Sequence, residues 1–264
     1  MIRALGAWNL SWRFIRIWNR NVLVYRKIWL VNFLVPLLEP VLYLAAFGVG
    51  LSALIGKVPY DGEDLPYIAF IAPALLAVTM MYNSFFENTF ASFVRMYYQK
   101  TFDAMMATPL SLDDIIAGEI VWGATKSAIA SAIVLGVISA FGLAHYPEAL
   151  LILPLSFLGG LAFGTAGMIC TGLVPSIDMF NLPIFLFITP MFLFGGTFFP
   201  ISALPDWAQK LSLGLPLTHL VNLCRAFCLG RMSKDLIWNA VYLAVFFVAL
   251  FPVALNVMRR RLIH

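Results

Sequence analysis

Charged residues are scarce in this chain of 264 residues. Lys, Arg, Asp and Glu together make up 11% of it, whereas 62% of its residues are hydrophobic. An ordinary soluble domain has about 25% charged residues, so a surface facing water cannot be built from this composition. This excludes an ordinary soluble enzyme. Three cysteines are also too few for a disulfide framework.

The motifs of ATP hydrolysis, metal binding and covalent catalysis are missing as well. A phosphate-binding loop ends in Gly-Lys-Ser or Gly-Lys-Thr, but the nearest match, Gly56-Lys57-Val58, lacks the hydroxyl group. The three histidines are scattered along the chain, and no serine lies in a Gly-x-Ser-x-Gly elbow. We therefore expect no catalytic residue, no metal site and no cofactor bound by this chain.

Long apolar runs take up most of the sequence. A membrane-spanning helix needs about 20 apolar residues, and the chain offers six such runs. The predicted fold class is an all-α integral membrane protein in which residues 29–264 form one six-span domain. Pro36 and Pro40 should break the first span softly. The predicted spans are residues 29–54, 66–93, 112–143, 149–174, 179–199 and 236–258.

Two local patterns refine this arrangement. Ser111 and Asp114 have the spacing of a capping box, which predicts that the third span begins there. Gly160, Gly164 and Gly167 recur at four- and three-residue spacing in the fourth span. Small residues at that spacing let a neighbouring helix approach closely, so we expect this span to be tightly packed.

Residues 1–28 carry six Lys or Arg residues and no acidic residue. At 100° per residue Arg13, Arg16 and Arg20 share one side, while Trp12 and other apolar residues share the opposite side. This predicts an amphipathic helix in the lipid headgroup region, with its basic side toward anionic lipid. The basic residues are spread throughout rather than clustered before a cleavage site, which argues against a cleaved signal.

Residues 200–235 are too apolar for a solvated loop and too interrupted for a span. The segment begins at Pro200, and Pro205, Gly214, Pro216 and Gly230 divide it into short helices. Irregular backbone is tolerated at membrane depth only where it packs on protein or lines a cavity. This predicts a re-entrant or interfacial helical hairpin.

The positive charges are distributed unevenly across the predicted membrane. Six spans place both termini on one side, with six Lys or Arg before the first span, two between the second and third and three after the last, eleven in all. Because positive loops stay in the cytoplasm, both termini are predicted to be cytoplasmic. The net charge of +4 then reflects topology rather than nucleic-acid binding. The five residues on the other side are Lys57, Lys210, Arg225, Arg231 and Lys234.

Among the charged residues within predicted spans, three stand out, namely Glu39, Glu87 and Lys126. A charge in hydrocarbon costs about 2.5–3.5 kcal/mol or more, so each must face a partner or a cavity. Glu87 and Lys126 lie at similar depths in adjacent spans, which predicts a structural ion pair. Glu39 lies near the midplane of the first span, where it either contacts substrate or forms a hydrogen bond to a neighbouring helix.

Two motifs carry a resemblance to a known family. Residues 102–111, continuing to Gly118-Glu119, resemble the cytoplasmic segment of ABC-2 type permeases, the membrane subunits of ATP-binding-cassette exporters. Residues 199–207 and 215–219 resemble the segment before the last helix of the same family. Within it the chain is most similar to the nodulation protein J subgroup, whose members export lipo-oligosaccharide.

The resemblance implies an assembly of two permease copies with two copies of a separate ATPase subunit, which would bind ATP and Mg²⁺, in the bacterial inner membrane. Residues 1–28 would be an interface helix and residues 95–111 a coupling segment that docks on the ATPase. Residues 200–235 would form external helices near the exit. The residues assigned to the coupling segment are Phe102, Asp103, Met105, Met106, Thr108, Pro109 and Leu110; those assigned to the external hairpin are Pro200, Pro205, Trp207, Pro216 and His219.

The coupling segment has an apolar side formed by Phe102, Met105 and Met106 at three- and four-residue spacing. Such a stripe is too short to cross a membrane and too apolar to leave uncovered. We expect it to dock on the ATPase, and the alternative is that it packs against the inner surface of the chain itself.

The predicted function is the permease subunit of an exporter that moves a lipid-linked or amphiphilic substrate, such as a lipo-oligosaccharide, glycolipid or polysaccharide. The alternatives are an exporter of drugs, an ion-coupled secondary transporter that uses Glu39, and a membrane-embedded enzyme. The spans show no convincing internal repeat of the kind that secondary transporters have. The residues predicted to line the substrate path are Glu39, Tyr43, Phe85, Phe86 and Phe192.

Overall fold

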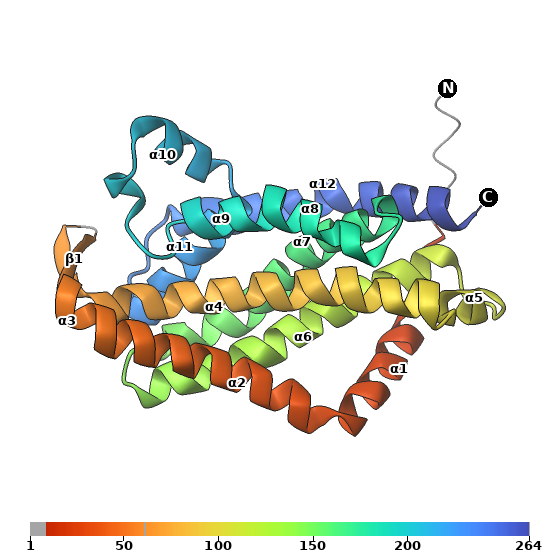
Figure 1. Cartoon of the computed structure of the whole chain (residues 1–264), viewed down its shortest axis with the longest axis horizontal. Helices are drawn as coiled ribbons and strands as arrows, with labels where there is room; N and C mark the ends of the chain where they lie inside the picture. The colour runs from red at the N-terminus through yellow and green to blue at the C-terminus, as the bar shows by residue number, and fades with distance from the viewer. Residues whose placement is uncertain (1–8, 61, 264) are drawn as a thin grey trace.

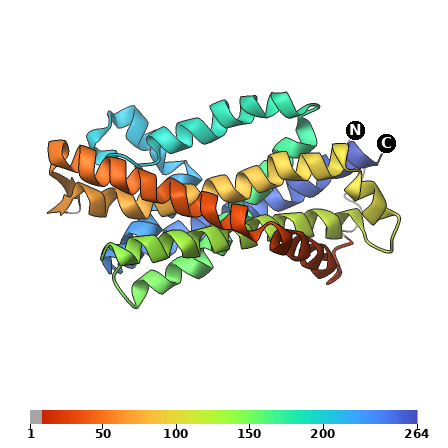
Figure 2. The same cartoon turned by 60° about the horizontal axis from the view of Figure 1, so that its bottom comes forward.

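Helices form nearly all of the ordered structure in a computed structural model that describes residues 9–60 and 62–263. The long helices lie side by side along the longest axis of the molecule (Figures 1 and 2). Within the described residues, five helices are long and apolar enough to cross a membrane: Tyr67–Tyr98, Leu112–Ala140, Glu148–Leu173, Ile177–Phe194 and Leu236–Leu262. They coincide with five of the six predicted spans, which confirms the all-α membrane class.

The first predicted span is helical without interruption from Trp29 to Ile55. It consists of α2 (Trp29–Ala45), the π-helical segment η1 (Ala46–Leu51) and α3 (Ser52–Ile55). The expected break at Pro36 and Pro40 is absent, because each proline removes only one helical N–H and the helix continues through both. The regular α geometry instead changes after Ala45.

The amphipathic helix α1 (Phe14–Lys27) precedes α2, and residues 1–8 of the predicted helix lie outside the described residues. Besides the basic and apolar sides expected from the sequence, α1 has a third, buried side that contains Ile17 and Asn21. This side packs on the helix that follows α5, where a Cβ atom added to Gly118 would lie 2.7 Å from Ile17 Cβ. The helix is therefore held by protein as well as suited to lipid.

A two-stranded hairpin closes one end of the molecule. Strands β1 (Lys57–Tyr60) and β2 (Glu63–Pro66) are antiparallel, with Val58 opposite Leu65. The chain then enters α4 (Tyr67–Phe86), which continues through the π-helical segments η2 (Glu87–Ala91) and η3 (Val94–Tyr98). The helix thus ends about five residues later than predicted, and residues 95–98 belong to it rather than to a separate coupling segment.

Helix α5 (Thr101–Met106) follows a reversal at Lys100, whose φ of 52° is left-handed. Helix α6 (Leu112–Ala140) then begins at the predicted capping box, which is confirmed: Asp114 N–H donates to Ser111 Oγ at 3.0 Å, and Ser111 N–H donates to Asp114 Oδ2 at 3.3 Å. The box fixes where the long helix starts.

Helix α7 (Ile152–Leu173), preceded by the short η4 (Glu148–Leu151), packs between α4 and α6 through its glycines. A Cβ atom on Gly160 would lie 2.6 Å from Ala124 Cα, and one on Gly164 would lie 2.6 Å from Ser84 Oγ. The expectation of close helix approach at these glycines is confirmed.

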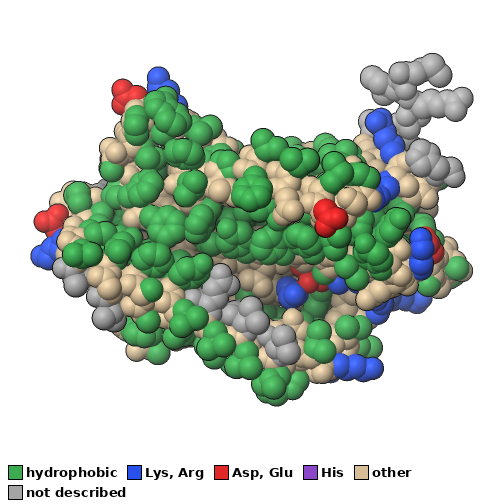
Figure 3. Space-filling model, viewed as in Figure 1, with side chains coloured by type: hydrophobic (Ala, Val, Ile, Leu, Met, Phe, Trp, Pro, Cys, Tyr) green, Lys and Arg blue, Asp and Glu red, His purple; other side chains and the backbone are tan. Residues whose placement is uncertain are grey.

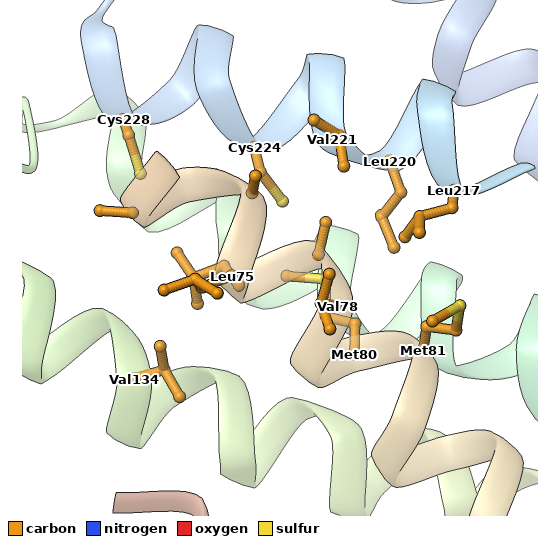
Figure 4. Close-up of a cluster of buried hydrophobic side chains, with 14 of the residues drawn as sticks. Leu75, Val78, Met80, Met81, Val134, Leu217, Leu220, Val221, Cys224 and Cys228 are labelled. Carbon is orange, nitrogen blue, oxygen red and sulfur yellow. The ribbon is translucent and has the colours of Figure 1, made fainter. Parts of the chain in front are cut away.

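The C-terminal third starts with residues 177–194, a helix that alternates between 3₁₀, α and π geometry. It ends with the regular helix α12 (Leu236–Leu262). Between them, α10 (Asp206–Leu213) and α11 (Pro216–Leu229) meet at an angle of 84°, so these two helices form a bent pair rather than one straight span. Figure 4 shows Leu217, Val221 and Cys224 of α11 facing side chains of α4. The elements are η5 (Ile177–Phe180), α8 (Asn181–Pro183), η6 (Ile184–Ile188), α9 (Thr189–Phe194), η7 (Ile201–Ala203), α10 (Asp206–Leu213), α11 (Pro216–Leu229) and α12 (Leu236–Leu262).

The start and the end of the described chain lie at the same end of the molecule, beside the first turn of α6. Asn9 N–H donates to Asp113 Oδ2 at 2.8 Å, and Arg259 Nε of α12 donates to Asp113 Oδ1 at 2.8 Å. Helix α5 lies at this end too, whereas β1 and α10 lie at the opposite end (Figure 1). We call these the α5 end and the α10 end.

Candidate functional site

A cluster of buried charges joins α4 and its π-helical extension to α6. Lys126 Nζ donates to Glu87 Oε2 at 2.9 Å, so the two residues singled out from the sequence meet. Arg95 is the centre of the cluster, because its Nη1 donates to Glu87 Oε1 at 2.8 Å and its Nε donates to Glu119 Oε2 at 2.8 Å. Each carboxylate thus faces at least one cation.

Neutral donors complete this cluster. Trp122 Nε1 donates to Glu87 Oε1 at 3.0 Å, Ser92 Oγ donates to Glu119 Oε2 at 2.8 Å, and Asn21 Nδ2 of α1 donates to Glu119 Oε1 at 2.9 Å. Glu119 is fully buried, so these bonds replace the water that its carboxylate would otherwise need. The cluster ties the amphipathic helix to two spans.

The sequence prediction missed Arg95 and Glu119. Arg95 was assigned to a cytoplasmic loop because charge normally marks the end of a span, but here the helix continues around it. A usable signal was present in α6, where Glu119, Trp122 and Lys126 recur at three- and four-residue spacing and therefore share one side of the helix.

A cavity of about 450 Å³ lies beside the cluster, between α1, the start of α2, the extended α4 and α6. Figure 3 shows a hollow on this face that contains acidic and basic atoms within a largely hydrophobic surface. Burial lowers the pKa of the Arg20 guanidinium, an effect that Glu119 opposes. Burial also raises the pKa of Tyr25, and the charge of Glu87 adds to this shift. Arg20 nevertheless stays charged near pH 7, because a guanidinium group is not deprotonated in proteins, and the raised pKa keeps Tyr25 neutral.

The predicted coupling segment has its apolar side turned inward. Phe102 is fully buried and Met105 nearly so, in a hydrophobic cluster with Phe93, Met96 and other residues of the α5 end. The expectation that this stripe waits uncovered for a partner is wrong, because the chain's own helices cover it. The outward side of the segment consists of Asp103, Ala104, Ala107, Thr108 and Pro109; Met106 and Leu110 are half-buried.

Aromatic rings form a connected row along α4 and its neighbours. Tyr82, Phe86 and Phe90 recur every four residues on one side of this helix, and each ring centroid lies within 6 Å of the next. Phe85 contacts Phe86 but is fully buried in the core, so it supports the row without lining its surface. We call this set the aromatic row: Tyr43, Phe47, Phe198, Phe192, Tyr82, Phe86, Phe90 and Phe180, in order of contact.

At the α10 end a second guanidinium is buried. Arg225 of α11 is 1% exposed, and its Nε donates to Phe70 O at 3.0 Å while Nη2 donates to the carbonyl oxygens of Gly196 and Thr197. Its guanidinium carbon lies 3.7 Å from the centroid of the Phe70 ring. No carboxylate of the described residues pairs with it. The sequence count had placed this residue in an external loop.

The other residues assigned to the external hairpin have different surroundings. His219 links three helices, since its Nδ1 lies 2.7 Å from Asn239 Oδ1, its Nε2 lies 3.0 Å from Leu213 O and its ring stacks on Tyr242. Trp207 is 63% exposed and contacts Phe194. Pro216 is buried at the first turn of α11, whereas Pro205 is exposed and Pro200 half-exposed.

Two further sequence expectations concern Glu39 and metal ions. Glu39 lies in α2, but its side chain lies outside the described part of the structure. Across residues 9–60 and 62–263, no three His, Cys, Asp or Glu side chains gather in a way that could hold a metal ion.

Comparison with known proteins identifies the family. A model of the ABC-2 type transporter family matches residues 13–229. The chain belongs to this family. It is 37% identical over 252 residues to Nodulation protein J of Sinorhizobium fredii (strain NBRC 101917 / NGR234), which covers 96% of this chain and 95% of that protein. It is 37% identical over 263 residues to Nodulation protein J of Rhizobium leguminosarum bv. trifolii, covering 100% and 98%.

A more distant relative is the inner membrane transport permease YadH of Escherichia coli (strain K12), 24% identical over 245 residues that cover 92% of this chain and 93% of that one. The resemblance inferred from the two motifs is thus confirmed over nearly the whole chain. The chain is a membrane permease, a transport subunit of a family whose members normally work with an ATP-binding-cassette ATPase.

Proposed function

We propose that this chain is the membrane subunit of an exporter that moves an amphiphilic, lipid-linked substrate out of the cytoplasm or the inner leaflet. The observation that carries the proposal is the similarity to Nodulation protein J over 94% or more of the chain. A lipo-oligosaccharide or a related glycolipid is the expected class of cargo. ATP hydrolysis in a separate subunit would drive the movement, with two permease copies and two ATPase copies in the assembly.

The aromatic row supports this class of cargo. Its rings run from Tyr43 in α2 to Phe180 before α8, and several, such as Tyr82, Phe86 and Phe192, are only partly buried. Ring faces suit both sugar rings and acyl chains because they offer a large apolar surface. A path along this row would let an amphiphile keep one continuous set of contacts between the α5 end and the α10 end.

We assign the docking of the ATPase to the outward side of α5 and the turn after it. Asp103, Ala104 and Ala107 are exposed there, while the buried Phe102 holds the segment against the chain's own core. A short helix fixed in this way transmits force to the spans because it cannot move without displacing Phe93 and Met96, with which it shares a hydrophobic cluster.

The docking assignment is tested by Asp103→Arg in the permease co-purified with its ATPase subunit. The variant should keep the permease folded but weaken association about tenfold or more, since a charge is reversed within an interface. Asp64→Arg is the matched control, because Asp64 is exposed at the opposite end of the molecule. Equal association of both variants with the ATPase would contradict the assignment.

The cargo class is tested by ATP hydrolysis of the reconstituted complex. Lipo-oligosaccharide should stimulate hydrolysis, whereas the same oligosaccharide without its acyl chain should not. Stimulation by the bare oligosaccharide, or by a small ion alone, would contradict an amphiphilic cargo.

We further propose the bacterial inner membrane as the location, with the α5 end in the cytoplasm, on the basis of the uneven distribution of Lys and Arg, ten to four once Arg95 and Arg225, which lie within helices, are left out of the loop count. Arg260→Cys and Lys234→Cys place single thiols at exposed positions of the α5 end and the α10 end. In intact cells an impermeant maleimide should label only the second, provided that the partly exposed Cys170 is first replaced. Labelling of Arg260→Cys would reverse the orientation.

A further inference from the structure

The cavity beside the charged cluster has an excess of positive charge. Among its described lining residues, Arg20, Arg95 and Lys126 are cationic and Glu87 is anionic. Glu119, which binds Arg95 from behind, brings the balance to three cations against two carboxylates. One positive charge is therefore left without a carboxylate in a partly buried site, where an unmatched charge is costly. An anion bound in the cavity would remove that cost.

The cations in the cavity retain capacity to bind such an anion. Lys126 has three N–H donors, of which one is directed at Glu87, and its side chain is 24% exposed. Asn32 and Gln99 add polar groups to the lining. The lining thus combines a charged donor with amide groups, and both kinds of group donate to phosphate-type oxygens.

The exposed rim of the lining includes two apolar side chains as well as the polar Gln99. Val24 and Ile28 of the α1–α2 corner line the cavity, yet they are 50% and 54% exposed. The neighbouring Trp29 is 58% exposed. A free inorganic anion would gain nothing from such a rim, whereas an alkyl chain attached to the anion would cover it and be removed from water. The lining therefore matches an amphiphile rather than a small ion.

We propose that this cavity, which we call the α1 pocket, binds the anionic headgroup of an amphiphile whose alkyl chain lies over Val24 and Ile28. Helix α1 forms one wall, and the tie between Asn21 and Glu119 holds that wall against α6. The role of the pocket as the place where cargo enters rests on the proposed export function. The binding of an anionic amphiphile does not depend on it.

The test uses the full-length permease in nanodiscs of phosphatidylcholine, with dodecyl phosphate as the probe. Val24→Cys places a thiol in the lining, and Leu23→Cys, at a 61% exposed position outside the lining, is its control. Both are made in a background without Cys170. Dodecyl phosphate should slow maleimide labelling of Val24→Cys about tenfold and leave Leu23→Cys unchanged. Inorganic phosphate and the neutral dodecyl glucoside should have no effect.

A second arm tests the charge. Lys126→Gln should raise the dodecyl phosphate concentration needed for protection about tenfold, the loss of one charge-assisted bond. Lys234→Gln, at an exposed position of the α10 end, should leave it unchanged. Arg20→Gln should act in the same direction as Lys126→Gln, which keeps the test valid if the latter does not fold.

Each other outcome overturns the proposal. Protection by inorganic phosphate would make the cavity a free-anion site, and equal protection by dodecyl glucoside would make it an apolar groove without charge selectivity. No protection at all would show that the cavity binds neither. Failure of the proposed export function is seen separately. If dodecyl phosphate still binds but no glycolipid stimulates the ATPase, the α1 pocket remains a binding site and its role in transport is removed.

Discussion

The guanidinium groups of Arg95, which is 14% exposed, and of the buried Arg225 are held in opposite ways. Arg95, toward the α5 end, is bound by the carboxylates of Glu87 and Glu119. Arg225, toward the α10 end, is bound by the backbone carbonyls of Phe70, Gly196 and Thr197. The first residue neutralises side-chain charge, and the second provides donors to backbone carbonyls, two of which, those of Gly196 and Thr197, lie outside any helix. The same residue type therefore solves two different problems in one membrane protein.

The difference follows from the local backbone. Around Arg95 the helices are continuous, so their carbonyls are already bonded and only side chains need partners. Residues 195–199 leave the helix after α9, and in a membrane their carbonyls have no water to bond. A carboxylate can be replaced by mutation, but a carbonyl cannot. Arg225 should thus be harder to substitute than Arg95, although it forms no ion pair.

Arg225→Met is expected to have the largest effect, a loss of about 3–5 kcal/mol in the free energy of unfolding, because three carbonyls lose a charged donor. Arg225→Lys should recover little, since a single ammonium cannot reach Phe70 and Gly196 from the same positions as the planar guanidinium. Thermal unfolding followed by size-exclusion chromatography checks both. Arg231→Met, which breaks the exposed bridge to Glu63, should change stability by less than about 1 kcal/mol. A stable Arg225→Lys variant would remove the contrast between the two sites.

Arg95→Met should cost somewhat less, about 2–4 kcal/mol, because it leaves Glu119 buried with only neutral donors. Adding Glu119→Gln should recover part of this loss, since the unmatched charge is then removed. The coupling energy from the double-mutant cycle measures the difference. No such rescue is available at Arg225, which has no carboxylate partner among the described residues. If the stability losses of Arg95→Met and Glu119→Gln simply added, the two arginines would not differ in this respect.

Gly160→Ala tests whether the close packing of α7 behind the charged cluster matters. The new Cβ would lie 2.6 Å from the backbone of Ala124, which cannot yield without shifting a helix. We expect a loss of about 1–3 kcal/mol. Gly136→Ala is the matched control, because no atom lies within 4 Å of its added Cβ, and it should be neutral or slightly stabilising. Equal effects would show that α6 and α7 adjust freely.

Features that depend on regular spacing along one helix were predictable from the sequence. The apolar runs predict the spans, the capping box predicts the start of α6, and the glycines of α7 predict a close neighbour. Each of these patterns is local, and each has one physical interpretation. The membrane class and the family motifs were accessible for the same reason.

Features that depend on what covers a surface were not predictable. The spacing of Phe102 and Met105 shows that one side of α5 is apolar, but only the fold shows that Phe93 and Met96 cover it. Arg95 and Arg225 look like loop residues because positive charge usually marks a membrane boundary. Their burial depends on partners from distant parts of the chain, Glu119 for the first and Phe70 for the second, and no local pattern contains that information.

Lys126→Met should have the smallest effect within the charged cluster. Taken as an isolated pair, Glu87 and Lys126 would behave symmetrically, and removing either would leave a buried charge unmatched. The structure predicts otherwise, because Glu87 keeps Arg95 and the Trp122 indole N–H as partners and Lys126 is partly exposed. With Arg20 counted, the loss of Lys126 leaves two cations against two carboxylates. We expect a change of about 1 kcal/mol or less. A loss of stability as large as that of Arg95→Met would mean that Lys126, not Arg95, is the centre of the cluster. The residue to compare with Arg225, which is held by carbonyls, would then be a lysine held by one carboxylate.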